Sequence, residues 1–191
     1  MKRGIAVRIL AVIPARGGSK GIPRKNIRLM NGRPLISYAI ANARASQYIT
    51  DVFVSTDSAE IADIARSYGA HIVERDHCLS SDLVTLDPVV FHAKKEAEKQ
   101  CNCTFDYIVT MQPTSPLLRV ETLDAGIDYT IREGFDTVIS VVNKPHLSWG
   151  RDDSGKLCPL YQERKRNSLP NIWRQGLLWW HGRHVSKNIH V

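Results

Sequence analysis

Glycines and cationic side chains cluster in one segment of the chain, which runs from Ile13 to Asn26 and reads Ile-Pro-Ala-Arg-Gly-Gly-Ser-Lys-Gly-Ile-Pro-Arg-Lys-Asn. Glycines let backbone N–H groups converge on an anion, and Arg16, Lys20, Arg24 and Lys25 add fixed positive charge. This combination predicts a cradle for a triphosphate. Composition alone leaves a flexible basic surface loop as an equal alternative.

Other patterns that could do chemistry are weaker. The segment has neither the GxxxxGK[ST] spacing of a Walker A loop nor the GxGxxG spacing of a dinucleotide fingerprint. The histidines are scattered without metal-ligand spacing, and Ser19 has no base nearby in the sequence that would make it a nucleophile. Asp57 either touches a ligand from the end of a strand or caps a helix.

The glycine-rich segment directly follows Arg8 to Pro14, a short apolar run typical of a strand buried on both faces of a parallel sheet. Asn31 and Gly32 predict a turn, and predicted helices and strands then alternate. This order predicts an α/β fold with a single doubly wound, mostly parallel, Rossmann-like sheet, whose ligand site lies beyond the carboxyl ends of the strands. The further predicted strands are 51–55, 71–73, 107–111 and 137–142, and the predicted helices are 34–45, 59–68, 86–100 and 121–133.

The chain length of 191 residues suits a single domain, residues 1–191. The alternation of strands and helices stops between Pro145 and Leu169, where Asp153-Ser-Gly155 is typical of a hairpin turn. We therefore expect a β-ribbon over residues 145–170 that projects from the sheet.

The net charge of +7 indicates an anionic ligand. Basic residues concentrate in 16–33 and 164–174 rather than along one helix, which suits the phosphates and carboxylates of a small molecule. No aromatic residues interleave with them for base stacking, so nucleic acid is not the expected partner. No apolar run is long enough to cross a bilayer and no signal peptide is recognisable, so we expect a soluble, cytoplasmic protein without a membrane partner.

The glycine-rich segment resembles the nucleotide-binding signature of the acylneuraminate cytidylyltransferase (CMP-N-acetylneuraminate synthetase) family. Further matches follow in the family's order: Val54-Ser-Thr-Asp57 at a strand end, Arg75 with Ser80-Ser-Asp82, and Gln112-Pro-Thr-Ser-Pro116 after a strand. The resemblance covers about Ile9 to Arg174. Ordered matches of this kind are far more specific than a single motif.

The resemblance implies a nucleotide-diphospho-sugar transferase-like fold and a CTP-dependent reaction. The anomeric hydroxyl of a nine-carbon keto sugar acid attacks the α-phosphate of CTP, pyrophosphate leaves, and Mg²⁺ offsets the developing charge. The sugar acid is an N-acylneuraminate, a legionaminate or a pseudaminate. Another keto sugar acid such as Kdo is the alternative within this class, and a truncated, non-catalytic CTP-binding remnant is the alternative outside it. The family also implies a homodimer, formed partly through the ribbon.

The resemblance assigns roles to particular residues. Arg166, within residues 164–170, falls where the family keeps an arginine against the sugar carboxylate, and a solvated basic stretch is the equal alternative. Arg16 and Lys20 would act in catalysis as well as in binding. The implied nucleotide-binding residues are Arg16, Ser19, Lys20, Asn26, Arg75 and Thr85, and the implied sugar-binding residues are Gln112, Ser115 and Arg166.

One departure from the family concerns its metal ligands. An acidic Asp-x-Asp pattern holds the catalytic Mg²⁺ in the family, and nothing like it occurs before Val191. We therefore expect the metal ligands to be missing, the chain to be truncated at its C-terminus, and turnover to be weak.

A second departure lies at residues 175–182, which read Gln-Gly-Leu-Leu-Trp-Trp-His-Gly where the family has a strand resembling Thr-Gly-Ala-Phe. Codons for Thr-Gly-Ala-Phe-Met-Val-Ala-Arg, read from their second base, can encode this octet. We hypothesise a local frameshift, which resequencing the gene would test; an intact frame with the same octet in near relatives would contradict it. The alternative is that Trp179 and Trp180 form a native exposed patch for a partner or a second subunit.

Overall fold

The computed structural model describes residues 7–19, 21–81, 83–142, 149–151, 157–159 and 174–181. The chain groups into two compact units. The larger unit contains Met1–Ile139 and Leu177–Val191, and the smaller unit contains Ser140–Gly176.

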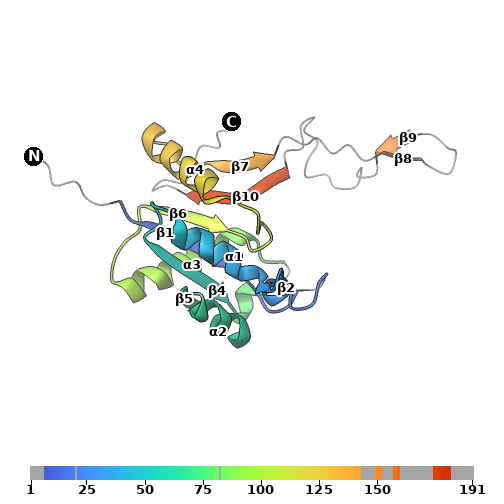
Figure 1. Cartoon of the computed structure of the whole chain (residues 1–191), viewed down its shortest axis with the longest axis horizontal. Coiled ribbons are helices and arrows are strands. Elements are labelled where there is room, and N and C mark those ends of the chain that lie inside the picture. The colour runs from blue at the N-terminus through green and yellow to red at the C-terminus, as the bar shows by residue number, and fades with distance from the viewer. Residues whose placement is uncertain are drawn as a thin grey trace, which may run out of the picture. The chain divides into compact units, whose positions relative to one another are not determined.

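A β-sheet forms the centre of the larger unit (Figure 1). The larger unit contributes β1 (Ile9–Pro14), β4 (Asp51–Thr56), β5 (His71–Glu74), β6 (Tyr107–Met111) and most of β10 (Arg174–His181). From its second residue on, β7 (Ile139–Val142) belongs to the smaller unit.

The strand order in this sheet is β5-β4-β1-β6-β10-β7. The pairs β1–β4, β1–β6 and β4–β5 are parallel, whereas β10 runs antiparallel to β6, with Leu178 opposite Met111. The sheet is therefore mostly parallel, as the sequence predicts. The antiparallel β10, which coincides with the octet at 175–182, was not foreseen as a neighbour of β6.

The central strand β1 is buried on both faces, which explains its continuous apolar run. Ala11 and Ile13 belong to one apolar core, and Leu10 and Val12 belong to a second core on the opposite face. All four side chains are fully buried. A strand of this kind must carry helices on both sides.

Helices cover both faces of the sheet, which confirms the doubly wound prediction. Apolar residues of α1, α2 and α4 pack into the first core, and those of α3 pack into the second. The helices are α1 (Leu35–Ala45), α2 (Ala59–Ser67), α3 (Leu86–Cys101) and α4 (Val120–Glu133).

The start and end of α2 follow from particular residues. Ser58 is the N-cap, because its Oγ accepts a hydrogen bond from the Ile61 N–H at 3.4 Å. Gly69 follows the helix at φ +83°, and a Cβ there would lie 1.4 Å from Nη1 of Arg44. The positive φ favours glycine at this position, where it ends the helix.

Shorter elements surround the main sheet. The predicted turn at Asn31 and Gly32 is present, with φ of +48° and +74°, and it joins β2 to β3 in a small hairpin. Pro34, predicted in the first turn of a helix, instead ends β3 and occupies the N-cap position of α1. The hairpin strands and two unpredicted 3₁₀ helices are β2 (Leu29–Met30), β3 (Arg33–Pro34), η1 (Lys25–Ile27) and η2 (His77–Leu79).

In the smaller unit, β8 (Trp149–Arg151) and β9 (Leu157–Pro159) pair antiparallel, with Gly150 opposite Cys158. They lie on either side of the predicted hairpin turn, whose residues fall outside the described ranges. Within the described ranges, no helix combines the length and apolar character needed to cross a membrane.

Candidate functional site

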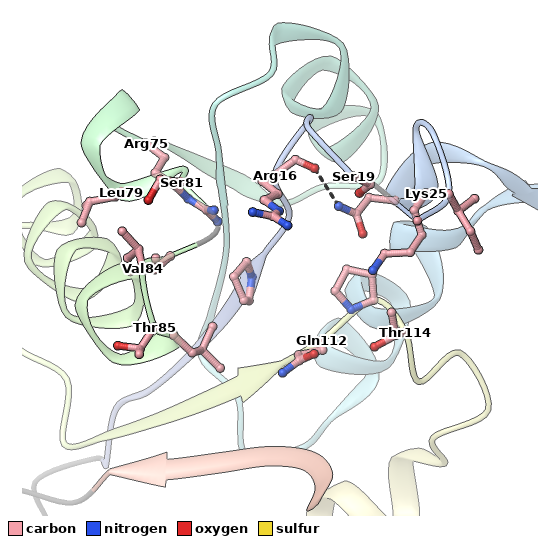
Figure 2. A pocket seen from close by; sticks show the side chains of 17 residues that line it. Arg16, Ser19, Lys25, Arg75, Leu79, Ser81, Val84, Thr85, Gln112 and Thr114 are labelled. Atoms are coloured by element: carbon pink, nitrogen blue, oxygen red, sulfur yellow. Dashed lines mark hydrogen bonds between the residues drawn. The ribbon is translucent and has the colours of Figure 1, made fainter. Parts of the chain in front are cut away.

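A cavity of about 570 Å³ lies where the sequence places the ligand, beyond the carboxyl ends of the parallel strands. Its size falls in the range of small-molecule sites, roughly 300–1,000 Å³. Three segments line it: the glycine-rich loop after β1, the stretch from β5 to α3, and the turn after β6 (Figure 2). These segments carry three of the four motifs on which the family resemblance rests.

The structure brings most of the predicted site residues together in this cavity. Ser115 does not line it, although its neighbours Gln112 and Thr114 do. Lys20 and Arg166 lie outside the described residues. The predicted residues that line the cavity are Arg16, Ser19, Asn26, Arg75, Thr85 and Gln112.

Some lining residues have no predicted role. Ser81 lies within a matched segment, so its motif was the available signal, whereas Lys25, which also lines the cavity, is one of the cations predicted for the triphosphate cradle. Leu79, Val84 and Val89 add an apolar wall, and nothing in their sequence context distinguishes them from ordinary core residues.

The glycine-rich loop is closed by its own side chains. Asn26 is buried, and its Nδ2 donates a hydrogen bond to the backbone oxygen of Arg16 at 2.9 Å. This bond joins the two ends of the loop and is drawn as a dashed line in Figure 2. Arg24 adopts a left-handed conformation with φ +55°, which lets the chain turn into η1. Asn26 therefore shapes the loop, whatever else it contacts.

The glycines of this loop face different surroundings. A Cβ at Gly17 would lie 3.0 Å from Cβ of Ser58, so the loop packs tightly against the start of α2. A Cβ at Gly18 or Gly21 would meet nothing within 4 Å. The backbone at Gly21, which lines the cavity, is therefore open to a close approach by a ligand.

Arg75 is held rigidly at the back of the cavity. Its side chain donates to the backbone oxygen of Ser55 from Nη2 at 2.7 Å and to the Ser55 hydroxyl from Nε at 3.2 Å. Only 9% of the residue is exposed. Burial lowers the pKa of Arg75, the negative charge of Asp57 raises it, and the positive charge of Arg16 lowers it again, with a net downward shift.

The guanidinium groups of Arg16 and Arg75 lie next to each other in Figure 2. Two like charges held this close repel, and an anion between them would relieve the repulsion. The guanidinium fork is well suited to phosphate and carboxylate oxygens. This part of the cavity is therefore chemically suited to an anionic ligand.

Asp57 is the carboxylate at the edge of this cationic region. Its Oδ1 accepts a hydrogen bond from the Gly17 N–H at 2.8 Å. Burial works to raise the pKa of Asp57, but the backbone N–H groups of Gly17 and of Asp57 itself, the Ser80 hydroxyl and the charge of Arg75 outweigh it. The pKa of Asp57 is thus held below its ordinary value, and the side chain is ionised at neutral pH.

The turn after β6 forms the other side of the cavity. It is built from consecutive backbone bonds, Ser115 N–H to the Gln112 oxygen at 3.3 Å and Leu118 N–H to the Ser115 oxygen at 3.2 Å. The side chain of Asn42, on α1, donates to the Leu118 oxygen at 2.6 Å. A single side chain from the helical layer thus fixes the end of this turn.

Magnesium sites require several oxygen ligands, usually including carboxylates. No group of three or more His, Cys, Asp or Glu side chains that could hold a metal ion occurs among the residues that the structure describes. Asp57 is already engaged by the Gly17 N–H.

Comparison with known proteins agrees with this geometry. Residues 10–148 match the family model described as "Cytidylyltransferase", which covers most of the chain, so the chain belongs to the cytidylyltransferase family. The curated relatives include enzymes that act on sialic-type sugars, which confirms the narrower resemblance to the acylneuraminate cytidylyltransferases.

Three relatives define that similarity. The CMP-N,N'-diacetyllegionaminic acid synthase of Legionella pneumophila is 40% identical over 79% of this chain and 66% of its own length. The N-acylneuraminate cytidylyltransferase A of Danio rerio is 37% identical over 82% of this chain and 35% of its own length. The pseudaminic acid cytidylyltransferase of Campylobacter jejuni (serotype O:2) is 44% identical over 64% of this chain and 53% of its own length. The chain thus spans about one third to two thirds of the length of these relatives.

A solved structure shares the fold. The CMP:2-keto-3-deoxy-manno-octonic acid synthetase complexed with CTP superposes with a TM-score of 0.63, covering 92% of this chain and 74% of that chain, at 15% identity. Similarity at that identity establishes the architecture alone, and it agrees with the predicted Rossmann-like sheet.

Proposed function

We propose that this protein binds CTP and transfers its CMP group to a sialic-type nine-carbon keto sugar acid, with release of pyrophosphate. One observation carries the proposal: three motifs that match the acylneuraminate cytidylyltransferases converge on one cavity that contains Arg16, Lys25 and Arg75. The names of the relatives support the sugar class, since they act on N-acylneuraminate, legionaminic acid and pseudaminic acid.

In the proposed reaction the anomeric hydroxyl oxygen bonds to the α-phosphorus of CTP. The bond from that phosphorus to the oxygen of the β-phosphate breaks, pyrophosphate leaves with the bonding electrons, and the hydroxyl proton passes to solvent or a base that we do not assign. Arg16 and Lys25 would attract the phosphates and reduce the charge repulsion against the incoming hydroxyl. Their contribution is electrostatic, since phosphoryl transfer needs positioning more than covalent chemistry.

The remaining lining residues suit the two other parts of the substrates. Thr85 and Arg75 belong to the wall that we assign to the cytidine moiety, and Gln112 belongs to the wall that we assign to the sugar acid. The proposal has three further parts. Lys20 would be a second phosphate ligand, Arg166 would pair with the sugar carboxylate, and Ser115 would lie beside the sugar. Magnesium is proposed as the ion that would accompany the triphosphate and supply charge neutralisation when bound.

A pyrophosphate-release assay tests the proposal on the full chain. CTP and Mg²⁺ would be supplied with N-acetylneuraminate, N,N'-diacetyllegionaminate, pseudaminate or Kdo in parallel reactions. Release with a nine-carbon acid supports the proposal, and release with Kdo alone would move the protein to the alternative within the class. Saturable CTP binding by calorimetry without release would favour a nucleotide-binding protein that does not turn over.

A pair of variants separates a specific site from general basicity. Arg16→Ala removes a lining charge, whereas Arg28→Ala removes an exposed charge near the same loop that does not line the cavity. We expect Arg16→Ala to weaken CTP binding by about tenfold or more, as the loss of a charge-assisted contact would. Equal effects of the two variants would contradict a defined triphosphate site.

A cytoplasmic homodimer, assembled partly through residues 145–170, is also proposed on the basis of the family resemblance. Light scattering of the full chain, compared with a variant in which residues 152–156 are replaced by a short Gly-Ser linker, would test it. A monomeric mass for the unmodified chain would contradict the proposed assembly.

A further inference from the structure

Asp57 has a structural task that neither of its sequence interpretations anticipates. The sequence left two roles open, contact with a ligand from the end of β4 and capping of α2. The cap is Ser58, whose hydroxyl accepts from Ile61. Asp57 instead accepts the backbone N–H of Gly17, a residue in the loop after β1, at 2.8 Å.

The same carboxylate also faces the segment after β5. The Ser80 hydroxyl and the positive charge of Arg75 both lower the pKa of Asp57. The backbone supports this proximity, because the N–H of Arg75 donates to the oxygen of Thr56, the residue before Asp57, at 2.8 Å. Asp57 therefore lies between two loops that come from different strands and that together line most of the cavity. A single ionised group in this position can hold both loops at once, because a carboxylate accepts several hydrogen bonds.

The loop after β1 also packs closely against Asp57 and Ser58. A Cβ at Gly17 would lie 3.7 Å from Oδ1 of Asp57 and 3.0 Å from Cβ of Ser58. Holding Gly17 from this side leaves the backbone at Gly21 open toward the cavity that it lines, since a Cβ there would meet nothing within 4 Å. The contact thus orients the loop instead of competing for its ligand.

We infer that Asp57 is a positioning residue, which fastens the loop after β1 to the Arg75 segment and thereby sets the geometry of the nucleotide site without touching the nucleotide. The identity of the ligand rests on the proposed function; the fastening itself does not.

Substitution can separate positioning from charge. Asp57→Asn keeps an oxygen that accepts from Gly17 but removes the negative charge, whereas Asp57→Ala removes both. We expect Asp57→Ala to weaken CTP binding by about tenfold or more and Asp57→Asn by about threefold or less, since a net hydrogen bond to a charged group accounts for changes of this size. Asp63→Asn is the matched control, because that exposed carboxylate on α2 pairs with Arg66 away from the cavity.

The NMR signal of the Gly17 backbone amide is the most specific readout, because a general loss of structure would not reproduce its expected changes. In the full chain without nucleotide, its ¹H shift should move upfield in Asp57→Ala and stay near the original value in Asp57→Asn and Asp63→Asn. With decreasing pH the shift should stay constant down to the ordinary pKa of an aspartate, about 4, because the folded pKa of Asp57 is lowered. Below it the carboxyl loses its charge but keeps an oxygen that accepts from Gly17, so the change should be as small as in Asp57→Asn. The charged groups that influence this titration are Arg75 and, beyond it, Arg16.

The outcomes are decisive in either case. The inference is overturned if Asp57→Ala leaves the Gly17 shift unchanged, or if Asp57→Ala and Asp63→Asn bind CTP equally well. If the unmodified protein binds no CTP, the proposed function fails, and the Gly17 shift together with binding of inorganic pyrophosphate still decides the role of Asp57. Circular dichroism of each variant identifies any that does not fold, in which case Asp57→Asn and the pH titration of the Gly17 shift in the unmodified protein carry the test.

Discussion

The two sides of the cavity are held in place in different ways. On the nucleotide side, three side chains hold the loops after β1 and β5. Asp57 accepts from the Gly17 N–H, Arg75 donates to the Ser55 oxygen on β4, and Asn26 donates to the Arg16 oxygen within its own loop. On the acceptor side, the turn after β6 depends on its own backbone bonds and on Asn42. A strongly cross-linked side suits a flexible chain such as a triphosphate, which must be held in one geometry for the reaction, while a side with fewer such bonds can vary with the sugar.

The largest effect is expected from Arg75→Met on the nucleotide side. It removes two hydrogen bonds to Ser55 from a buried residue. We expect the free energy of unfolding to fall by about 1.5–3 kcal/mol, as for hydrogen bonds made by charged groups, and CTP affinity to fall roughly a hundredfold. Urea unfolding and calorimetry measure the two effects. Arg66→Met, which breaks an exposed pair with Asp63, is the control; equal losses in both variants would contradict the proposed difference.

Two neighbouring glycines provide the next test, because their surroundings differ. Gly17→Ala places a Cβ 3.0 Å from that of Ser58, whereas Gly18→Ala meets nothing within 4 Å. Overpacking should lower the free energy of unfolding of Gly17→Ala by about 1–3 kcal/mol. Gly18→Ala should leave it unchanged within about 0.5 kcal/mol. Because Gly18 does not line the cavity, it should also leave CTP binding nearly unchanged, whereas Gly17→Ala should weaken CTP binding by displacing the loop. Thermal unfolding with and without CTP distinguishes the two, and identical behaviour would show that the loop is not oriented as described.

On the acceptor side, Asn42→Ala removes the bond to the Leu118 oxygen. The expected cost in the free energy of unfolding is about 1 kcal/mol, the net contribution of one such bond. The KM for the sugar acid should rise while the KM for CTP stays constant, because only the turn after β6 is loosened. Steady-state kinetics with Gln47→Ala, an exposed residue just beyond α1, as the control would check this. A rise in the KM for CTP would mean that the two sides are not independent.

The smallest effect is expected from Glu60→Gln, which breaks an ion pair with Arg24 that also links the glycine-rich loop to α2. Both side chains are more than half exposed, at 68% for Arg24 and 51% for Glu60. Solvent screening should limit the change in the free energy of unfolding to less than about 1 kcal/mol, and the change should shrink further as salt is added. Chemical unfolding at two salt concentrations measures it. A larger loss in the free energy of unfolding that does not depend on salt would mean that this pair, like Asp57, helps to hold the loop in place.

The sequence predicted the parts of this molecule that depend on local pattern. Apolar runs identified the parallel strands, and glycine-rich and polar motifs identified the segments that converge at their carboxyl ends, because a parallel sheet brings those ends to one edge. Arg16, Asn26 and Arg75 were placed in this way, although the reason that Asn26 matters, its bond to the Arg16 oxygen, was not visible.

Contacts between segments that are distant in the sequence could not be predicted from the sequence. The partner of Asp57 is Gly17 and the partner of Asn42 is Leu118, and nothing in the spacing of either pair specifies that they meet. The left-handed conformation of Arg24 has no sequence signal, since arginine is not favoured there. The antiparallel position of β10 beside β6 was missed for a similar reason, because pairing order depends on the whole fold.

That position of β10 also has a consequence for synthesis of the protein. β6 pairs with β1 on one edge and with β10 on the other, and Met111 lies opposite Leu178. A ribosome makes β6 long before β10, so the outer edge of β6 has unpaired backbone groups for much of translation. Unprotected strand edges recruit other chains. The strand that leads into the acceptor turn is thus an edge at which the nascent chain can pair with other chains, until the antiparallel strand emerges and covers it.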